Sequence, residues 1–360
     1  MRILSLNFLL GLVFLCSPIL NAQELPEWQN LSVVTQNTEA PRSTFYVYDS
    51  EEEAVENAYY NSKNLLLLNG TWKFNLADTP EQRPRDFYLP EFKTTDWDDI
   101  NVPGDWQMQG YDFPLYVSAG YTHAINPPFV DTIYNPVGSY KREFKIPKGW
   151  NDKQIKLYFG GVTSAFYVWI NGKKVGYDED AKTPSEFDIT SFVKPGNNEI
   201  AVEVYRWSDG TYLEDQDFWR LSGIERDVYV YAQPKAHIQD FFFKAGLDGK
   251  YIDGIFDGKI AIKNDGATTE KLQLDLKIRD ANEELYSVTQ SLKLASAKTD
   301  TLQFQETFET IEPWSAEHPK LYQVVLSLRK GDELLMSTSA KIGFRTSEIK
   351  NGNLLVNGKP

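Results

Sequence analysis

The sequence contains almost no cysteine and very little histidine. Cys16 is the only cysteine among 360 residues, and it falls within a segment that has the features of a cleaved leader. A mature chain without cysteine has no disulfide bond, no thiol nucleophile and no cysteine-ligated metal. The three histidines, His123, His237 and His318, are too far apart in sequence to indicate a metal cluster. Such a chain must be stabilised by its hydrophobic cores.

Long apolar runs are also missing, except at the N-terminus, so no transmembrane segment is expected. Residues 3–15 are apolar, but about a dozen residues are too few to span a bilayer. A positive start and the small residue Ala22 predict a signal peptide over residues 1–22, cut near Ala22, and a secreted or periplasmic protein. A lipid anchor at Cys16 is less favoured, because lipoprotein signals have a small residue where Leu15 stands. An uncleaved anchor or a buried strand would also fit this apolar run.

Basic residues are outnumbered by acidic ones. The chain has 37 Lys and Arg against 51 Asp and Glu, which gives a formal charge of −14. Such a charge argues against nucleic acid and anionic membranes as partners. Aromatic residues make up 14% of the chain. They serve sugar sites and β-sandwich cores alike, and the core is the commoner use.

Short strand-like runs between turn signals begin at residue 65, after a polar and irregular segment over residues 23–59 in which Glu51 starts a short helix. Asn69-Gly70 predicts a turn between two strands, and Asn171-Gly172 predicts another. No sustained helical periodicity competes with the strands. Spacing of this kind predicts an antiparallel sandwich. Its further candidate strands are residues 140–146, 155–159, 165–170, 173–177, 199–205 and 227–231.

A second set of strands follows a linker at Gln233-Pro234-Lys235. It contains seven candidates, which fit a seven-stranded immunoglobulin-like sandwich. They are residues 238–244, 259–263, 271–278, 285–294, 301–308, 322–328 and 334–342. The last residues then begin a new hairpin around Asn351-Gly352. We therefore expect an interrupted longer protein, since an isolated hairpin is only marginally stable.

Residues 206–223 form the segment with the highest density of candidate functional side chains. They place four carboxylates within nine residues, between tryptophans. A solvated acidic loop is the plain interpretation. However, Trp207, Phe218 and Trp219 would hold the segment against a packed surface, where carboxylates need a cation, an arginine or hydroxyl donors. Arginines would make the segment structural, whereas hard cations or sugar hydroxyls would make it functional. The pattern alone leaves both open.

This segment resembles the N-terminal part of the large β-galactosidases of glycoside hydrolase family 2. The resemblance extends in order over nearly all of residues 25–360, and the long acidic motif is specific, because relatives that cleave glucuronides or mannosides differ there. The matching motifs are VPGDWQMQGYD (102–112), NPPFV (126–130), PSEFD (184–188), RWSDGTYLEDQDFWRLSG (206–223), WSAEHPKLY (314–322), GFR (343–345) and LLVNGKP (354–360).

The resemblance implies an all-β chain. A jelly-roll, galactose-binding-like sandwich over residues 60–233 precedes an immunoglobulin-like sandwich over residues 234–345, and residues 346–360 start a truncated catalytic barrel. The (β/α)₈ barrel, absent from this chain, would carry the two glutamates that hydrolyse β-galactosides with retention. No carboxylate here is then catalytic, and the chain is expected to be inactive alone. Its implied partners are a β-galactoside or oligosaccharide, the barrel and a homo-oligomer, with no organic cofactor.

The resemblance also implies residues that help to bind substrate and cations. Asp217 matches an aspartate that binds a monovalent cation, sodium, and contacts galactose. A salt bridge to Arg220 is the alternative. Ser118 stands where the family has a galactose-binding asparagine, which puts the glycoside specificity in doubt because a hydroxyl is shorter than an amide and has fewer donors.

A divalent cation, such as magnesium, ties the N-terminal segment of the family to the first sandwich. The matching residues all have oxygen ligands, which magnesium prefers. They are Glu27, Asn30, Glu179 and Asp209. Two other functions stay open for the whole chain, a stand-alone carbohydrate-binding module and a structural fragment that complements a partner subunit.

Overall fold

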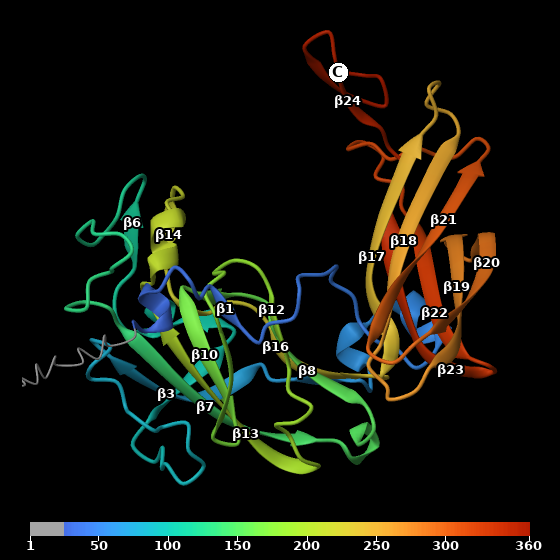
Figure 1. The fold of residues 1–360 in the computed structure, drawn as a ribbon. Helices are drawn as coiled ribbons and strands as arrows, with labels where there is room; N and C mark the ends of the chain where they lie inside the picture. The colour runs from blue at the N-terminus through green and yellow to red at the C-terminus, as the bar shows by residue number, and fades with distance from the viewer. Residues whose placement is uncertain (1–24) are drawn as a thin grey trace, which may run out of the picture.

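The computed structural model describes residues 25–360, so the predicted signal peptide and the alternative lipid anchor at Cys16 lie outside the described residues. The described chain forms two β-sandwiches in succession (Figure 1). The expected all-β architecture, a jelly-roll sandwich followed by an immunoglobulin-like one, is confirmed. Within residues 25–360, no helix is both long and apolar enough to cross a membrane.

The first sandwich packs a seven-stranded antiparallel sheet against a four-stranded one. The larger sheet runs in the order β1 (Thr35–Gln36), β11 (Lys173–Asp178), β10 (Ala165–Ile170), β13 (Gly196–Tyr205), β7 (Val137–Ile146), β3 (Gly70–Ala77) and β4 (Asp98–Val102). The smaller sheet runs in the order β12 (Ser185–Asp188), β8 (Gln154–Phe159), β16 (Val228–Gln233) and β2 (Leu65–Leu67). Because β1 is the edge of the larger sheet, the N-terminal segment is part of this sandwich.

The larger sheet buries side chains on both of its faces. On one face, Val202 of β13 packs with Trp72 of β3 and Leu157 of the opposite sheet. On the other face, neighbouring residues of the same strands join a second, aromatic cluster that includes Trp28 and Trp207. Because side chains alternate between the two faces of a strand, both faces of the sheet are covered. The aromatic cluster thus fixes the start of residues 206–223, the acidic segment, against the sheet.

The second sandwich contains all seven strands that the sequence predicts. Its three-stranded sheet runs in the order β17 (Ala236–Leu247), β18 (Gly254–Asn264) and β21 (Lys298–Phe308). Its four-stranded sheet runs in the order β20 (Glu283–Leu294), β19 (Glu270–Asp280), β22 (Tyr322–Lys330) and β23 (Glu333–Ile342). Strictly alternating burial along β18 shows that one face of each sheet makes the core.

One predicted turn is correct and the other is wrong. Asn171 and Gly172 both have positive φ angles and join β10 to β11 in a hairpin. Asn69 and Gly70, in contrast, lie between strands of different sheets, since β2 pairs with β16 and β3 pairs with β7 and β4. The Asn69 side chain explains the difference, because it donates to Asp227 and accepts from the backbone of Val228.

A single α-helix of the described chain, α1 (Glu51–Glu56), lies against the second sandwich. Ser50 caps it by accepting a hydrogen bond from the backbone N–H of Glu53 at 3.1 Å. Glu51 then binds Lys277 and Ser327 of the second sandwich at 2.7 and 2.9 Å. The polar N-terminal segment predicted over residues 23–59 therefore contacts both sandwiches, and the short helix predicted at Glu51 is confirmed.

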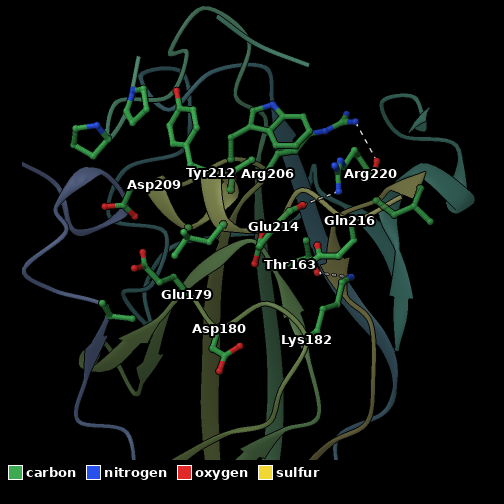
Figure 2. Close-up of a pocket in the computed structure, with 18 of the residues that line it drawn as sticks. Thr163, Glu179, Asp180, Lys182, Arg206, Asp209, Tyr212, Glu214, Gln216 and Arg220 are labelled. Atoms are coloured by element: carbon green, nitrogen blue, oxygen red, sulfur yellow. Dashed lines mark hydrogen bonds between the residues drawn. The ribbon is translucent and has the colours of Figure 1, made fainter. Parts of the chain in front are cut away.

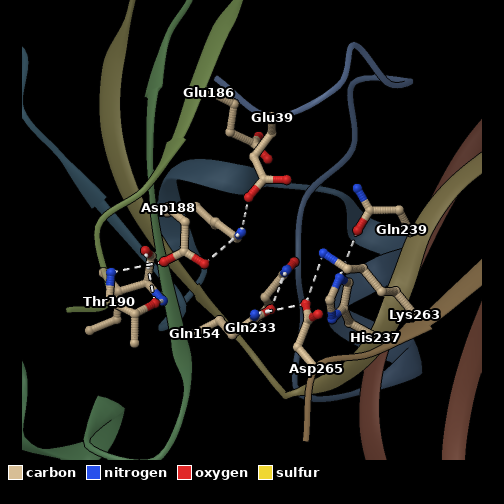
Figure 3. A network of polar contacts seen from close by, with 12 residues as sticks. Glu39, Gln154, Glu186, Asp188, Thr190, Gln233, His237, Gln239, Lys263 and Asp265 are labelled. Atoms are coloured by element: carbon tan, nitrogen blue, oxygen red, sulfur yellow. Dashed lines mark hydrogen bonds and ion pairs between the residues drawn. The ribbon is translucent and has the colours of Figure 1, made fainter. Parts of the chain in front are cut away.

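Buried polar groups join this N-terminal segment to the two sandwiches (Figure 3). Lys156 is 3% exposed and pairs with Glu39 and Asp188 at 2.5 and 3.0 Å. Across the junction, Gln154 of the first sandwich donates to Asp265 of the second at 2.8 Å. The ion pairs of Lys156 therefore hold the N-terminal segment on the first sandwich, and the hydrogen bond between Gln154 and Asp265 joins the first sandwich to the second.

Several short elements complete the described chain. The C-terminal hairpin predicted around Asn351-Gly352 is present, with β24 (Ser347–Lys350) and β25 (Asn353–Val356). The 3-10 helices are η1 (Glu27–Gln29), η2 (Tyr59–Asn61), η3 (Trp106–Gln109), η4 (Lys148–Trp150) and η5 (Asp209–Leu213). The remaining strands make small ribbons at the edge of the first sandwich, namely β5 (Gly104–Asp105), β6 (Leu115–Val117), β9 (Val162–Thr163), β14 (Phe218–Arg220) and β15 (Gly223–Ile224).

Candidate functional site

A two-stranded ribbon carries Asp217 and Ser118 to the same tip. β6 and β14 pair antiparallel, with Phe218 opposite Val117, and the ribbon projects from one edge of the first sandwich (Figure 1). Ser118 directly follows β6 and Asp217 directly precedes β14. Both side chains are exposed. Two residues that are distant in sequence therefore become neighbours, as a shared binding role requires.

Asp217 is held by a tyrosine of the facing strand. The hydroxyl of Tyr116 donates to Asp217 Oδ1 at 2.5 Å, and this hydrogen bond raises the pKa of Tyr116. The Tyr116 ring also packs on Trp219 at a centroid distance of 5.5 Å. A carboxylate has about four lone-pair sites, and one phenol uses only one of them. Asp217 thus retains oxygen lone pairs for a hydroxyl group or a cation.

Arg220 does not form an ion pair with the Asp217 carboxylate. Its guanidinium pairs with Asp215 at 3.2 Å, and Asp215 also accepts the backbone N–H of Gly120 at 2.8 Å. The alternative salt bridge between Asp217 and Arg220 is therefore not formed. Instead, Asp215 and Arg220 fix the loop after β6 to the acidic segment, which supports the position of Ser118. The Ser118 hydroxyl makes no hydrogen bond with residues 25–360.

Glu179 and Asp209 face one another near the buried end of the acidic segment (Figure 2). Asp209 is 2% exposed, and neither of its carboxylate oxygens has a hydrogen-bond partner among the described residues. Glu179 accepts a hydrogen bond from Tyr177 at 2.6 Å. Burial raises the pKa of Glu179 to about 8, with a further contribution from the nearby Asp209. Burial also raises the pKa of Asp209. This pair would favour either a shared proton or a cation.

Glu27 and Asn30 do not complete this pair. The Glu27 carboxylate binds Lys174 Nζ at 2.7 Å and accepts from the Tyr167 hydroxyl at 2.7 Å. These two bonds lower its pKa against the opposing effect of burial, which is the largest single influence. Asn30 accepts from the backbone of Ser32 at 3.2 Å. No group of three or more acidic, histidine or cysteine side chains within residues 25–360 is arranged to hold a metal ion.

A cavity of about 660 Å³ lies behind the acidic segment (Figure 2). Glu179 and Asp209 are at one side of it, and Glu214, Gln216 and Arg220 are at the other. Most of its wall comes from residues 206–221, with further contributions from residues 31, 34, 127, 128, 163, 179, 180 and 182. Asp217 is not part of the wall. The acidic segment therefore lies between the ribbon tip and a partly open cavity.

Sequence reasoning missed Tyr116 and Glu214. Tyr116 lies diagonally across the ribbon from Asp217, and the two residues are 101 positions apart, so only the register of β6 and β14 brings them together. Glu214 stands among other acidic residues and would be taken for a solvated side chain. Burial instead raises its pKa to about 7. The tryptophans on either side were the available signal for that burial.

Both sandwiches match family models. The sugar binding domain of glycosyl hydrolases family 2 matches residues 65–234, and a second domain, described as glycosyl hydrolases family 2, matches residues 236–345. Comparison with curated proteins finds relatives that cover nearly the whole chain. A beta-galactosidase of Priestia megaterium is 44% identical over 346 residues, which are 94% of this chain and 34% of the relative. A beta-galactosidase of Alteromonas mediterranea is 38% identical over 92% of this chain and 32% of its own length.

Solved structures resemble the fold at lower identity. A beta-glucuronidase of Bacteroides uniformis is 24% identical, with a TM-score of 0.69, over 82% of this chain and 34% of that chain. A family 2 member from Bacteroides cellulosilyticus is 22% identical, with a TM-score of 0.65, over 82% of this chain and 38% of that chain. The chain spans about a third of the length of the curated relatives it matches. Two consecutive domain matches and these relatives show that the chain belongs to glycosyl hydrolases family 2, of which it holds the N-terminal portion.

Proposed function

We propose that this chain is the N-terminal, substrate-binding and scaffolding part of a retaining β-galactosidase that hydrolyses terminal β-D-galactosides. The observation that carries the proposal is its 44% identity, over 94% of the chain, to a protein named beta-galactosidase. In this proposal the two catalytic glutamates belong to a barrel outside residues 25–360, and the chain without that barrel does not hydrolyse glycosides. Two β-sandwiches then position the substrate rather than transform it.

The ribbon tip supports a role in galactoside binding. Asp217 is exposed and is held by a single hydroxyl donor, Tyr116. A fixed carboxylate can accept a hydrogen bond from a sugar hydroxyl, and such charge-assisted bonds are among the stronger ones. Ser118 lies beside it and offers a shorter side chain than asparagine. We propose that Ser118 contacts the sugar less directly, which would alter affinity or favour another β-glycoside.

Two cations belong to the proposal. Asp217 would bind sodium through a carboxylate oxygen. Glu179 and Asp209 would bind magnesium, because two buried carboxylates with unsatisfied oxygens fit a hard cation. Glu27 would join them only if it gave up Lys174 and Tyr167. A magnesium ion would neutralise the carboxylate pair, and Glu179 and Asp209 would hold it against the first sandwich, close to the N-terminal segment.

A secreted or periplasmic location is also part of the proposal. It rests on the leader features of residues 1–22. Labelling of the mature N-terminus after expression would test it. A start near Gln23 is expected, and a retained Met1 would contradict it.

The proposal that the chain alone is inactive has a simple test. Purified residues 23–360 are expected to give no nitrophenol from nitrophenyl β-galactoside, while the intact Priestia megaterium relative serves as the positive control. Turnover by the chain that disappears when one of its own carboxylates is replaced would contradict the proposal. Turnover that survives every such replacement would indicate a contaminating enzyme and would leave the chain inactive.

A further inference from the structure

The cavity behind the acidic segment has the dimensions of a ligand site. Its volume of about 660 Å³ falls within the range of about 300–1,000 Å³ that is common for small-molecule sites. Its wall combines aromatic rings with a few polar groups, as such sites usually do. The aromatic members are Trp207, Tyr212, Phe218 and Trp219. Flat rings of this kind can pack against the C–H face of a sugar ring.

The wall contains buried polar groups without hydrogen-bond partners, and they include both acceptors and a donor. Asp209 is 2% exposed, and both of its oxygens are unpaired acceptors among residues 25–360. Trp207 is 4% exposed, and its indole N–H is an unpaired donor within the same residues. Buried polar groups in folded proteins are nearly always satisfied. A ligand that both donates and accepts hydrogen bonds would satisfy the two residues together, and a hydroxyl group does both.

The charges of the wall do not favour an anionic ligand. Its three cationic side chains already have carboxylate partners outside the wall. Lys182 pairs with Glu225 at 2.6 Å, Arg220 pairs with Asp215 at 3.2 Å, and Arg206 pairs with Asp112. Among the described residues, the carboxyl of Glu214 has no ion pair and no hydrogen bond. The wall therefore offers free acceptors and no free cation.

We propose that this cavity binds a neutral saccharide unit, of one or two sugar rings, through the acidic and aromatic side chains of residues 207–219. Glu214 and Gln216 would accept and donate bonds to its hydroxyls, and Phe218 would contact its apolar face. These three residues line the cavity, whereas Asp215 and Asp217, which alternate with them, do not. One segment of the chain thus contributes to two places, the cavity on one side and the ribbon tip on the other.

The proposal is compatible with a cation between Glu179 and Asp209. These two residues lie at one side of the cavity, and Glu214 and Gln216 lie at the other (Figure 2). A cation would satisfy Asp209 but would leave the indole N–H of Trp207 and the carboxyl of Glu214 without partners. The saccharide contacts are therefore assigned to the side that a cation does not explain.

Binding to the full chain tests the proposal. Methyl β-D-galactopyranoside and lactose would be titrated against it, with saturation-transfer NMR and tryptophan fluorescence as the two measurements. Saturable binding of at least one of these neutral sugars is expected, with weaker binding of the anionic sugar galacturonate. Magnesium would be present in one series and replaced by EDTA in a second. Absence of saturable binding in both series would overturn the proposal.

Two variants locate the binding site. Glu214→Met and Phe218→Ala are each expected to weaken binding by about tenfold, roughly the effect of one lost hydrogen bond or ring contact. Glu214→Met should not lower the melting temperature, because it removes a partly buried carboxyl that has no partner among the described residues. Phe242→Ala, which truncates a half-exposed aromatic ring of the second sandwich, is the matched control and should bind as the parent does.

Asp217→Asn separates this proposal from the proposed function. If saccharide binding is lost in Asp217→Asn and kept in Glu214→Met and Phe218→Ala, the sugar binds at the ribbon tip and the cavity proposal is overturned. If binding follows Glu214 and Phe218, the cavity is the site, whatever the outcome for galactoside hydrolysis in a protein completed by a barrel.

Discussion

At the scale of single residues, Asp217 combines exposure with a fixed position. Tyr116 holds one of its oxygens, and Arg220 is occupied by Asp215. A carboxylate used only for stability would be expected to pair with the nearest arginine. This one is left available at the tip of a ribbon, which is the arrangement that ligand binding needs.

Asp217→Asn should therefore impair function more than stability. In a protein completed by a barrel, we expect kcat/KM for galactosides to fall about ten- to a hundred-fold, the effect of losing one charge-assisted hydrogen bond of about 1.5–3 kcal/mol. Sodium activation should weaken as well. Kinetics across sodium concentrations, beside melting temperatures, would check this. Asp332→Asn, an exposed acid in the second sandwich, is the control. Unchanged kinetics with a lowered melting temperature would contradict the role of Asp217.

Ser118→Asn tests the second residue of the tip. An amide reaches further than a hydroxyl and has two donors. Because Ser118 follows β6 beside Asp217, we expect the variant to bind galactosides more tightly, with a lower KM and an unchanged melting temperature. An unchanged KM would show that the sugar is contacted elsewhere.

Glu179 and Asp209 should make stability depend on pH. Burial raises the pKa of both residues, that of Glu179 from 4.5 to about 8. The folded state thus binds these protons more tightly than the unfolded state, so stability falls as pH rises from about 4.5 to 8. In EDTA, we expect a higher melting temperature at pH 5 than at pH 8. Magnesium should raise it at pH 8 and have little effect at pH 5, where the carboxyls hold protons.

Asp209→Asn isolates this effect from the other titrating groups. The variant should flatten the pH dependence between pH 5 and 8 and should reduce the response to magnesium. Differential scanning fluorimetry of both proteins at each pH is sufficient. An equal magnesium response in the parent and in Asp209→Asn would place the cation elsewhere or show that none binds.

At the scale of elements, sequence patterns predicted where the strands lie better than they predicted which strands pair with one another. Alternation and turn residues found β10, β11 and all seven strands of the second sandwich. The identical Asn-Gly signal at residues 69–70 failed, because the Asn69 side chain bonds to Asp227 and Val228, which are more than 150 positions away. The pairing of β6 with β14 was equally invisible, since it joins residues 101 positions apart. Local patterns contain no information about such contacts.

The contribution of the N-terminal segment to the stability of the fold was not predicted from the sequence. Its Arg42 binds Glu186 at 2.7 Å, with side-chain exposures of only 10% and 11%, and also reaches the Tyr231 hydroxyl. Arg42→Ala would leave Glu186 buried without its partner. We expect the free energy of unfolding to fall by about 3–5 kcal/mol.

Chemical denaturation would measure that loss. Lys73→Ala is the matched control, because Lys73 pairs with Asp99 at 2.8 Å on an exposed surface and should contribute less than about 1 kcal/mol. Equal losses for Arg42→Ala and Lys73→Ala would mean that the segment does not stabilise the fold through this buried pair.

At the scale of the whole molecule, two sandwiches and one N-terminal segment form a framework for the ribbon tip. In Figure 1 the ribbon of β6 and β14 and the C-terminal hairpin extend on the same side of the molecule. In the proposed function, a site shared between Asp217 and a barrel after the hairpin would need this arrangement. The polar junction in Figure 3 would keep the distance between them constant.

A chimera tests the central claim most directly. This chain would replace the matching third of the Priestia megaterium relative, and hydrolysis of nitrophenyl β-galactoside would be measured for the chimera and for its Asp217→Asn variant. The account predicts an active chimera whose kcat/KM falls about ten- to a hundred-fold in the variant. A chimera that folds with the melting behaviour of its parent but does not hydrolyse galactosides would contradict the claim, and so would one in which Asp217→Asn has no effect on kcat/KM.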